Sequence, residues 1–205
     1  MTRLYVVNEH LAHIGGVADK MMNMLGMARD AFNRHRRQCL VELQEQARGV
    51  AGDIDAAKGK LENLLSRQSN EERVNLLRYH SILTHEQIMA EKIAALAGPL
   101  GKKIEDGVLF SSKAVSEANF IFDRQMGILR SLRDVVETGN DSLQQQVLEE
   151  GDKLADVCIE FATEHEHRVI EGLCLPQAAP IFLTLLDLFR TMARHDREIA
   201  QLLSQ

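Results

Sequence analysis

The residues of this chain that could do chemistry are carboxylates and histidines at helical spacing. Glu160, Glu164 and His167 form a Glu-x-x-x-Glu and a Glu-x-x-His pattern, which places the three side chains on one face of a helix. A Glu-x-x-His pair is half of the ligand set that holds two iron ions in carboxylate helical bundles. No second Glu-x-x-His occurs in the sequence. A solvated polar helix face is therefore the simpler interpretation, and a di-iron site is the alternative.

Glu86 is a carboxylate on an apolar helix face. It falls between Ile82 or Leu83 and Met89 in the segment that follows residue 70. Burying a carboxylate costs free energy unless it is paired, protonated or bound to metal. Two interpretations stay open: Glu86 ligates a divalent or iron ion or pairs with an arginine, or it is a half-exposed carboxylate at the end of a bundle.

Two groups of arginines could bind an anion or an acidic partner. In the last expected helix, Arg190, Arg194 and Arg197 recur at i, i+4 and i+7 and form a stripe away from the apolar face. The second group, where the first helix passes into the second, consists of Arg34, Arg36 and Arg37. Either group could hold phosphate, an acidic protein or lipid headgroups. Ion pairs with neighbouring acids are the simpler alternative.

The composition limits the class of protein. The 205 residues are 45% apolar and 26% charged, with three Pro, seven Phe, two Tyr and no Trp, which favours an all-helical chain. A net charge of −6 argues against general electrostatic binding to nucleic acid. Cys39, Cys158 and Cys174 form no Cys-x-x-Cys pair and fit free thiols in a reducing compartment. Without a signal-peptide pattern or an apolar run of about 20 residues, we expect a cytoplasmic protein.

Hydrophobic spacing predicts six long helices to position these residues. The clearest spans residues 40–65, where Leu40, Ala47, Ile54 and Leu61 repeat every seven residues. The others are a first helix that ends near Phe32, a third that starts at a capping box of Ser69 and Glu72 and fades near Gly98-Pro99, and helices over about 112–136, 142–170 and 180–205.

The order of these helices predicts an all-α fold of six long antiparallel helices. Three helices, a glycine-bearing connection near residues 98–110 and three more of similar length indicate two packed three-helix bundles. We expect the first bundle over residues 1–105 and the second over 106–205. No low-complexity linker separates them, so the bundles are expected to pack on each other as one unit.

Several strings in this order resemble the PhoU family, most closely the PhoU-like cytosolic domain of bacterial sodium/phosphate cotransporters. They are Met21-Met22-Asn23-Met24-Leu25, Gly52-Asp53-Ile54-Asp55, Val108-Leu109-Phe110-Ser111-Ser112, His167-Arg168-Val169-Ile170-Glu171-Gly172 and Phe182-Leu183-Thr184-Leu185-Leu186. The resemblance spans nearly the whole chain and implies the same fold of two three-helix bundles.

The family's Glu-Arg-Ile-Gly/Ala-Asp-His motif, which ligates metal in several members, is eroded here. Glu86 matches the family's Glu in the third helix, but Ala90 stands at the Asp position. In the sixth helix Arg190 and Arg194 replace both carboxylates, and two cations do not suit a divalent metal. The resemblance therefore implies at most an incomplete site for a divalent or iron ion, at Glu86, and no other cofactor.

The resemblance also implies a non-enzymatic regulatory or accessory domain in phosphate transport or phosphate signalling. Its expected partner is a membrane phosphate transporter, separate or part of the same polypeptide, or a signalling protein, contacted at the cytoplasmic face of the inner membrane. A homodimer is compatible with this expectation, and nucleic acid is not an expected partner. The alternatives are a metal-binding helical bundle that uses Glu86, Glu160, Glu164 and His167, and a coiled-coil oligomerisation module built on the heptads of residues 40–64.

Overall fold

The computed structural model describes residues 8–65 and 70–204, and these form helices and connections without a strand. The helices are α1 (Asn8–Arg34), α2 (Arg37–Leu65), α3 (Asn70–Ala95), α4 (Ala97–Glu105), α5 (Ser112–Thr138), α6 (Asp141–Ile170) and α7 (Ala179–Leu203), with a 3₁₀-helix η1 (Pro176–Ala178) before α7. The predicted all-α fold with six long helices is confirmed. α4 is an additional short helix.

The third predicted helix continues further than its sequence suggested. It breaks at Leu96 and resumes as α4, which contains Gly98 and Pro99 and ends only at Glu105. Pro99 has no N–H to donate to the carbonyl four residues earlier, and its ring crowds that carbonyl, so the α-helix cannot run through unchanged. The Leu96 N–H instead donates to the Ile93 carbonyl at 3.1 Å. The expected fading near Gly98-Pro99 was therefore wrong, because the proline produces a break and not an end.

The second set of helices begins and ends at capping residues. Ser111 caps α5, since its hydroxyl accepts from the Ala114 N–H at 3.3 Å. Gly139 ends α5 in the left-handed conformation at φ 59°, and Asn140 then caps α6. The predicted capping box of Ser69 and Glu72 lies outside the described residues.

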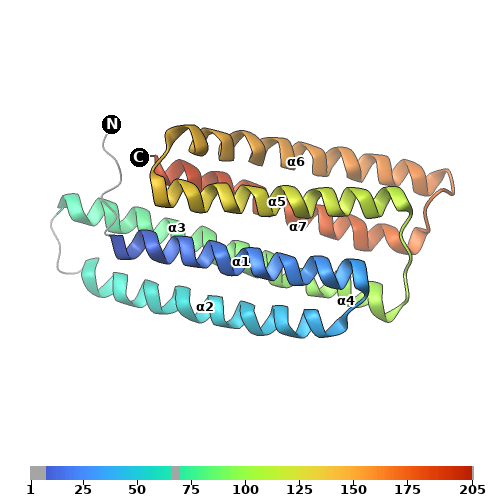
Figure 1. The fold of residues 1–205 in the computed structure, drawn as a ribbon, viewed down its shortest axis with the longest axis horizontal. Helices are drawn as coiled ribbons and strands as arrows, with labels where there is room; N and C mark the ends of the chain where they lie inside the picture. The colour runs from blue at the N-terminus through green and yellow to red at the C-terminus, as the bar shows by residue number, and fades with distance from the viewer. Residues whose placement is uncertain (1–7, 66–69, 205) are drawn as a thin grey trace.

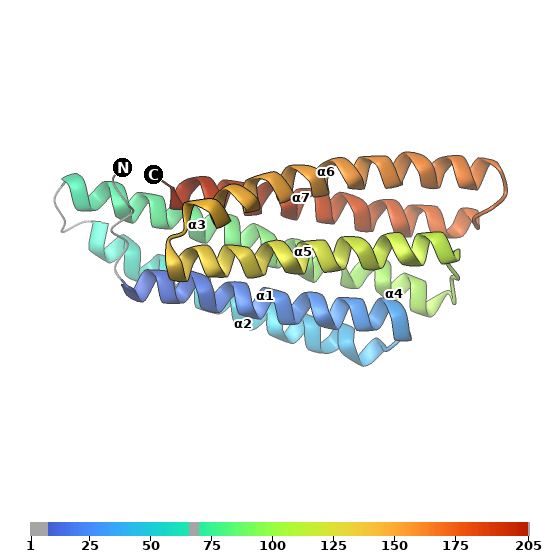
Figure 2. The same cartoon turned by 45° about the horizontal axis from the view of Figure 1, so that its top comes forward.

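The helices form two layers of three (Figures 1 and 2). α1, α2 and α3 with its extension α4 make one layer, and α5, α6 and α7 make the other. α1 lies against α5, and α3 lies against α7. One continuous hydrophobic core contains residues from both layers. The predicted domain boundary between residues 105 and 106 stays a prediction.

The two layers bury equivalent sequence positions, at one interval for the first two helices and at a second interval for the third. Buried residues of α1 and α2 recur 104 positions later in α5 and α6, and those of α3 recur 110 positions later in α7. The pairs include Val17 and Ile121, Leu25 and Leu129, Leu43 and Val147, Val50 and Leu154, Ile54 and Cys158, Ile82 and Met192, and Met89 and Ile199. The two halves of the chain are therefore related by a register of buried positions.

Two ion pairs between α1 and α5 repeat the same relation. Arg29 donates to Asp123 at 2.7 Å, and Arg133 donates to Asp19 at 3.1 Å. Arg29 and Arg133 are 104 positions apart, as are Asp19 and Asp123. The pairing is reciprocal, so α1 and α5 cross antiparallel about a local pseudo-twofold axis.

Two further expectations concern the cysteines and the membrane. Cys39, Cys158 and Cys174 are free thiols, as predicted. Among the helices that the structure describes, none combines the length and the apolar character needed to cross a bilayer.

Candidate functional site

Glu86 lies on α3 and points into the interior. Its side chain is 1% exposed, and its Oε2 has no hydrogen-bond partner. Burial raises the pKa of this carboxyl well above its ordinary value and so favours its protonated form. The half-exposed interpretation was wrong. Ala90, also buried, supplies no ligand, and in the described ranges no three His, Cys, Asp or Glu side chains gather closely enough to hold a metal ion. Metal binding at Glu86 stays a prediction.

Asp196 is the counterpart of Glu86 in α7, 110 positions later, and it was missed in the sequence. Its side chain is fully buried, and burial raises the pKa of its carboxyl well above the ordinary value. Gln125 of α5 donates to Oδ2 at 2.5 Å, which partly opposes that rise. The residue 104 positions before Gln125 is Met21, whose thioether cannot donate. The signal that could have found Asp196 is its place between Met192 and Ile199 on the apolar face of α7.

His85 and His195 meet where α3 crosses α7, each directly before one of these buried acids. Their Nδ1 atoms are 2.8 Å apart, so one ring donates and the other accepts, and the two cannot both carry a second proton. Burial lowers the pKa of both rings, that of His195 to about 4, and for His195 the nearby His85 and Arg194 add to the fall. The crossing of α3 and α7 therefore holds a neutral polar contact.

The residues of the predicted di-iron alternative do not form a metal site. Glu160 and His167 are exposed on α6, and Glu164 accepts from Arg168 at 3.3 Å. None of them belongs to a cluster of metal-ligand side chains in the described part of the chain. They form the solvated helix face that was the simpler interpretation.

The arginine stripe of α7 is largely paired. Arg190 donates to Asp187 at 2.7 Å, and Arg197 pairs with Asp152 of α6 at 2.9 Å. Arg197 reaches α6 over Gly151, where an added Cβ would lie 2.6 Å from the arginine Cγ. Arg194 is exposed and has no ion pair within the described residues.

Two of the three arginines at the α1–α2 turn lie close to an acidic side chain. Arg34 lies 3.7 Å from Asp30, and Arg37 pairs with Glu105 of α4 at 2.7 Å. Arg36 is exposed, without an ion pair among the residues described. The structure does not bring this turn together with the α7 stripe, since the turn lies at one end of the molecule and the second half of α7 runs toward the other end (Figure 1).

Lys103 of α4 fixes this turn from inside. Its ammonium donates to the Phe32 carbonyl at 2.9 Å and lies 2.7 Å from Nε2 of His35, which has a left-handed φ of 55°. It also lies over the rings of Phe32 and Phe110. Burial lowers the pKa of the Lys103 ammonium. The sequence interpretation missed this lysine, whose type does not distinguish it from solvent-exposed neighbours.

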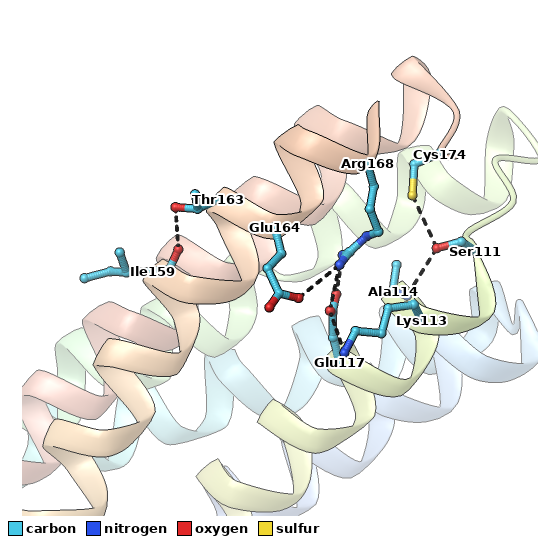
Figure 3. Close-up of polar contacts among 9 residues, drawn as sticks. All are labelled: Ser111, Lys113, Ala114, Glu117, Ile159, Thr163, Glu164, Arg168 and Cys174. Carbon is cyan, nitrogen blue, oxygen red and sulfur yellow. Dashed lines mark hydrogen bonds and ion pairs between the residues drawn. The ribbon is translucent and has the colours of Figure 1, made fainter. Parts of the chain in front are cut away.

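A buried ion pair joins α5 to α6 near one end of the molecule (Figure 3). Arg168 donates to both carboxylate oxygens of Glu117, at 2.6 and 3.0 Å. Glu117 is almost fully buried, Lys113 lies 3.6 Å from it, and Glu164 accepts from the same Nη1 of Arg168 at 3.3 Å. We call Arg168 and Glu117 the clamp.

The clamp lies beside the contact between two connections, residues 106–111 and 171–178. Cys174 donates to the Ser111 hydroxyl at 3.3 Å (Figure 3). Phe110 and Val108 pack with Ala178 and Ile181 in a small hydrophobic cluster. The α4–α5 and α6–α7 connections are therefore held against each other.

The architecture was compared with those of known proteins. No protein-family model and no curated protein sequence matches the chain. The solved structure of the phosphate transport system regulatory protein PhoU from Streptococcus pneumoniae is similar over 95% of this chain and 91% of that chain, with a TM-score of 0.82 and 11% identity. The chain has the PhoU fold. PhoU from Pseudomonas aeruginosa is similar over 98% of this chain and 94% of that chain, with a TM-score of 0.77 and 16% identity.

The predicted likeness to PhoU is thus confirmed at the level of the fold. Within this PhoU fold, α3 and α7 are the helices in which the family motif was expected. Arg190 and Arg194 are exposed there, whereas the buried carboxyl of α7 is Asp196. Because Asp196 is the counterpart of Glu86, the register of buried positions puts the first acid of the expected motif in α7 at Asp196. The expected placement at Arg190 and Arg194, which are exposed, was wrong.

Proposed function

We propose that this chain is a PhoU-like regulatory protein of phosphate transport or phosphate signalling, and that it acts by contact with a membrane phosphate transporter. The observation that carries the proposal is the PhoU fold over nearly the whole chain, shared with a protein described as a phosphate transport system regulator. The proposed action is non-enzymatic binding through helical surfaces.

The polar groups of the interior support a role in binding and not in catalysis. The clamp joins α5 to α6, Gln125 bonds Asp196, and His85 bonds His195. Each of these contacts links two helices, so the groups position helices relative to one another.

The finer form of the proposal concerns the transporter. We infer a sodium/phosphate cotransporter, either a separate protein or the same polypeptide, with the chain at the cytoplasmic face of the inner membrane. A homodimer is compatible with this arrangement. The support is the set of PhoU-like strings, such as Gly52-Asp53-Ile54-Asp55 and Val108-Leu109-Phe110, in the order expected for that group.

The arginines are the proposed contacts for anionic groups of the partner. They are Arg34, Arg36, Arg37, Arg190, Arg194 and Arg197. Arg36 and Arg194 are the strongest of these, because they are exposed and their guanidinium groups are not held by an acid of the described residues.

Phosphate uptake in the bacterium that encodes the chain tests the regulatory role. Deleting the coding segment is expected to uncouple uptake from external phosphate, and the wild-type chain is expected to restore the coupling. Unchanged uptake at both high and low phosphate would contradict the proposal. Elemental analysis of protein purified without chelator tests the metal alternative: a stoichiometric transition metal lost in Glu86→Gln would favour it.

A further inference from the structure

The most exposed large apolar side chains in the described part of the chain gather at one place. Ile170 is 82% exposed, Leu109 66% and Leu173 65%, and the neighbouring Leu175 is half exposed. They come from the end of α6 and from the two connections that Cys174 and Ser111 join. We call Leu109, Ile170, Leu173 and Leu175 the apolar tip.

The backbone beneath the apolar tip is fixed by inward-facing residues. Val108 and Phe110, on either side of Leu109, pack with Ala178 and Ile181. Cys174, between Leu173 and Leu175, is buried and bonds Ser111. The outward side chains are therefore held apart from the core by ordered neighbours, and binding at the tip requires little additional ordering.

The charges of these connections are acidic. Residues 106–111 and 170–178 contain Asp106 and Glu171 and no Lys or Arg. Asp106 and Glu171 are exposed, without an ion pair to the described residues. Of the cations next to these connections, Lys113 and Arg168 face Glu117, Lys103 is buried against the α1–α2 turn, and Lys102 is exposed. The Arg36 turn lies at the same end of the molecule, but it belongs to another connection (Figure 1).

We propose that the apolar tip docks into an apolar groove of a protein partner whose rim carries Lys or Arg. Exposed apolar side chains that cluster mark interaction sites, and the adjacent acids select the charge of the rim. An anionic bilayer fits less well, since inserting the tip would bring Asp106 and Glu171 against its headgroups. The proposal rests on the proposed function in one respect: cytoplasmic loops of membrane transporters have this basic character.

Two variants with matched controls isolate the tip. Leu109→Gln/Ile170→Gln/Leu173→Gln removes its apolar surface, and Val74→Gln/Leu77→Gln/Ile159→Gln changes three other exposed apolar residues, on α3 and within α6 away from the tip. Asp106→Lys/Glu171→Lys reverses its charge, and Glu45→Lys/Glu62→Lys makes the same change in net charge on α2. Unfolding by urea checks that each variant folds.

Binding is measured with three probes: the phosphate transporter encoded in the same genome, a 20-residue amphipathic Leu/Lys peptide, and vesicles of phosphatidylglycerol. The tip variant is expected to weaken transporter and peptide binding by more than about tenfold, and its control by less than about twofold. The charge reversal is expected to weaken both at low salt, with a smaller effect at 0.5 M salt.

The outcomes separate the two proposals. Peptide binding that depends on the tip, with no binding to the transporter, would keep the docking surface and contradict the proposed function. Equal loss in tip and control variants, or no peptide binding, would overturn the docking surface. Tip-dependent binding to the vesicles would assign it to a bilayer, and a concentration-dependent dimer lost in the tip variant would assign it to a second copy; either result overturns the proposal.

Discussion

The hydrogen bonding and protonation of single polar residues inside this molecule depend on the helix that faces them. Glu86 and Asp196 occupy equivalent positions in α3 and α7, yet only Asp196 has a donor, because Gln125 stands where α1 has Met21. Burial raises the pKa of both acids and so favours their protonated forms. Beside them, burial lowers the pKa of His85 and His195, so the fold disfavours a charge on all four of these titratable groups.

The histidine contact predicts a pH dependence. In the fold, the pKa of His195 is lowered from 6.5 to about 4, so between these values the unfolded chain binds a proton that the folded chain does not. The stability that the neutral pair contributes is therefore present above pH 6.5 and lost as the pH falls toward 4. Urea unfolding is expected to show a loss of about 1–3 kcal/mol over this range that His85→Gln/His195→Gln lacks.

Two buried acids change the stability with pH in the opposite direction, so the wild type must be compared with the histidine variant. Glu86 and Asp196 have raised pKa values in the fold, so their contribution rises as the pH falls. The difference between wild type and the histidine variant removes this shared term. Parallel pH profiles of the two proteins would contradict the assignment.

The clamp predicts a large effect from one substitution. Arg168→Met leaves Glu117 buried with only Lys113 at 3.6 Å, and breaking a buried pair in this way costs about 3–5 kcal/mol. Glu117→Gln/Arg168→Met is expected to recover most of that loss, because no charge remains buried. Urea unfolding of the four proteins in a double-mutant cycle measures both terms, and equal losses in the single and double variants would rule out this account.

The interior site could be predicted from the sequence only in part. Glu86 was recognisable because it interrupts an apolar face, and the same argument applies to Asp196 between Met192 and Ile199. The partners were not recognisable, since Gln125 and His85 come from helices whose rotation is set by packing across the layers. Arg168 was hidden for the same reason: its pairing depends on where α5 lies against α6.

Two glycines within helices distinguish the effect of helix propensity on stability from the effect of packing between helices. Gly52 of α2 has open space where a Cβ would lie, whereas at Gly151 of α6 a Cβ would meet Arg197 Cγ at 2.6 Å and the Ala193 carbonyl at 3.2 Å. Gly52→Ala is expected to stabilise the protein by about 0.5–1 kcal/mol. Gly151→Ala is expected to destabilise it despite the same gain in helix propensity.

Thermal or urea unfolding checks the pair of glycine variants. Arg197→Ala removes the nearest atoms. Gly151→Ala is therefore expected to cost less stability when it is added to Arg197→Ala than when it is added to the wild type. Stabilisation by Gly151→Ala alone would show that α6 and α7 separate easily, against the packing described here.

Most helix boundaries followed from local sequence, and one did not. Gly139 and Asn140 end α5 and start α6 through backbone geometry and a side-chain cap, which act locally. The break at Leu96 was misplaced because Pro99 was expected to end a helix. Leu96 and Leu100 are both fully buried, so tertiary packing holds α4 in line with α3 beyond the proline.

The whole molecule consists of two equivalent layers that share one core. Their contacts include the reciprocal pairs of Arg29 with Asp123 and Arg133 with Asp19, and the histidine contact between α3 and α7. The core residues of α1 and α5 belong to one hydrophobic cluster that extends across both layers. Each layer alone would expose this apolar face to water.

This arrangement predicts that the two halves need each other. Fragments 1–105 and 106–205, made separately, are expected to unfold without a cooperative transition, since each has lost the apolar contacts of α1 with α5 and α3 with α7. Mixed in equal amounts, they are expected to recover a cooperative transition by circular dichroism. Two independent cooperative transitions in the separate fragments would instead show that residues 1–105 and 106–205 are autonomous domains.

We propose that this chain regulates a phosphate transporter by binding it. The most direct test of this claim is the affinity of the purified chain for the phosphate transporter of its own genome, reconstituted in lipid nanodiscs, with an unrelated transporter as control. We predict saturable binding to the phosphate transporter that changes with phosphate concentration. Equal binding to both transporters, or to neither, would contradict the claim.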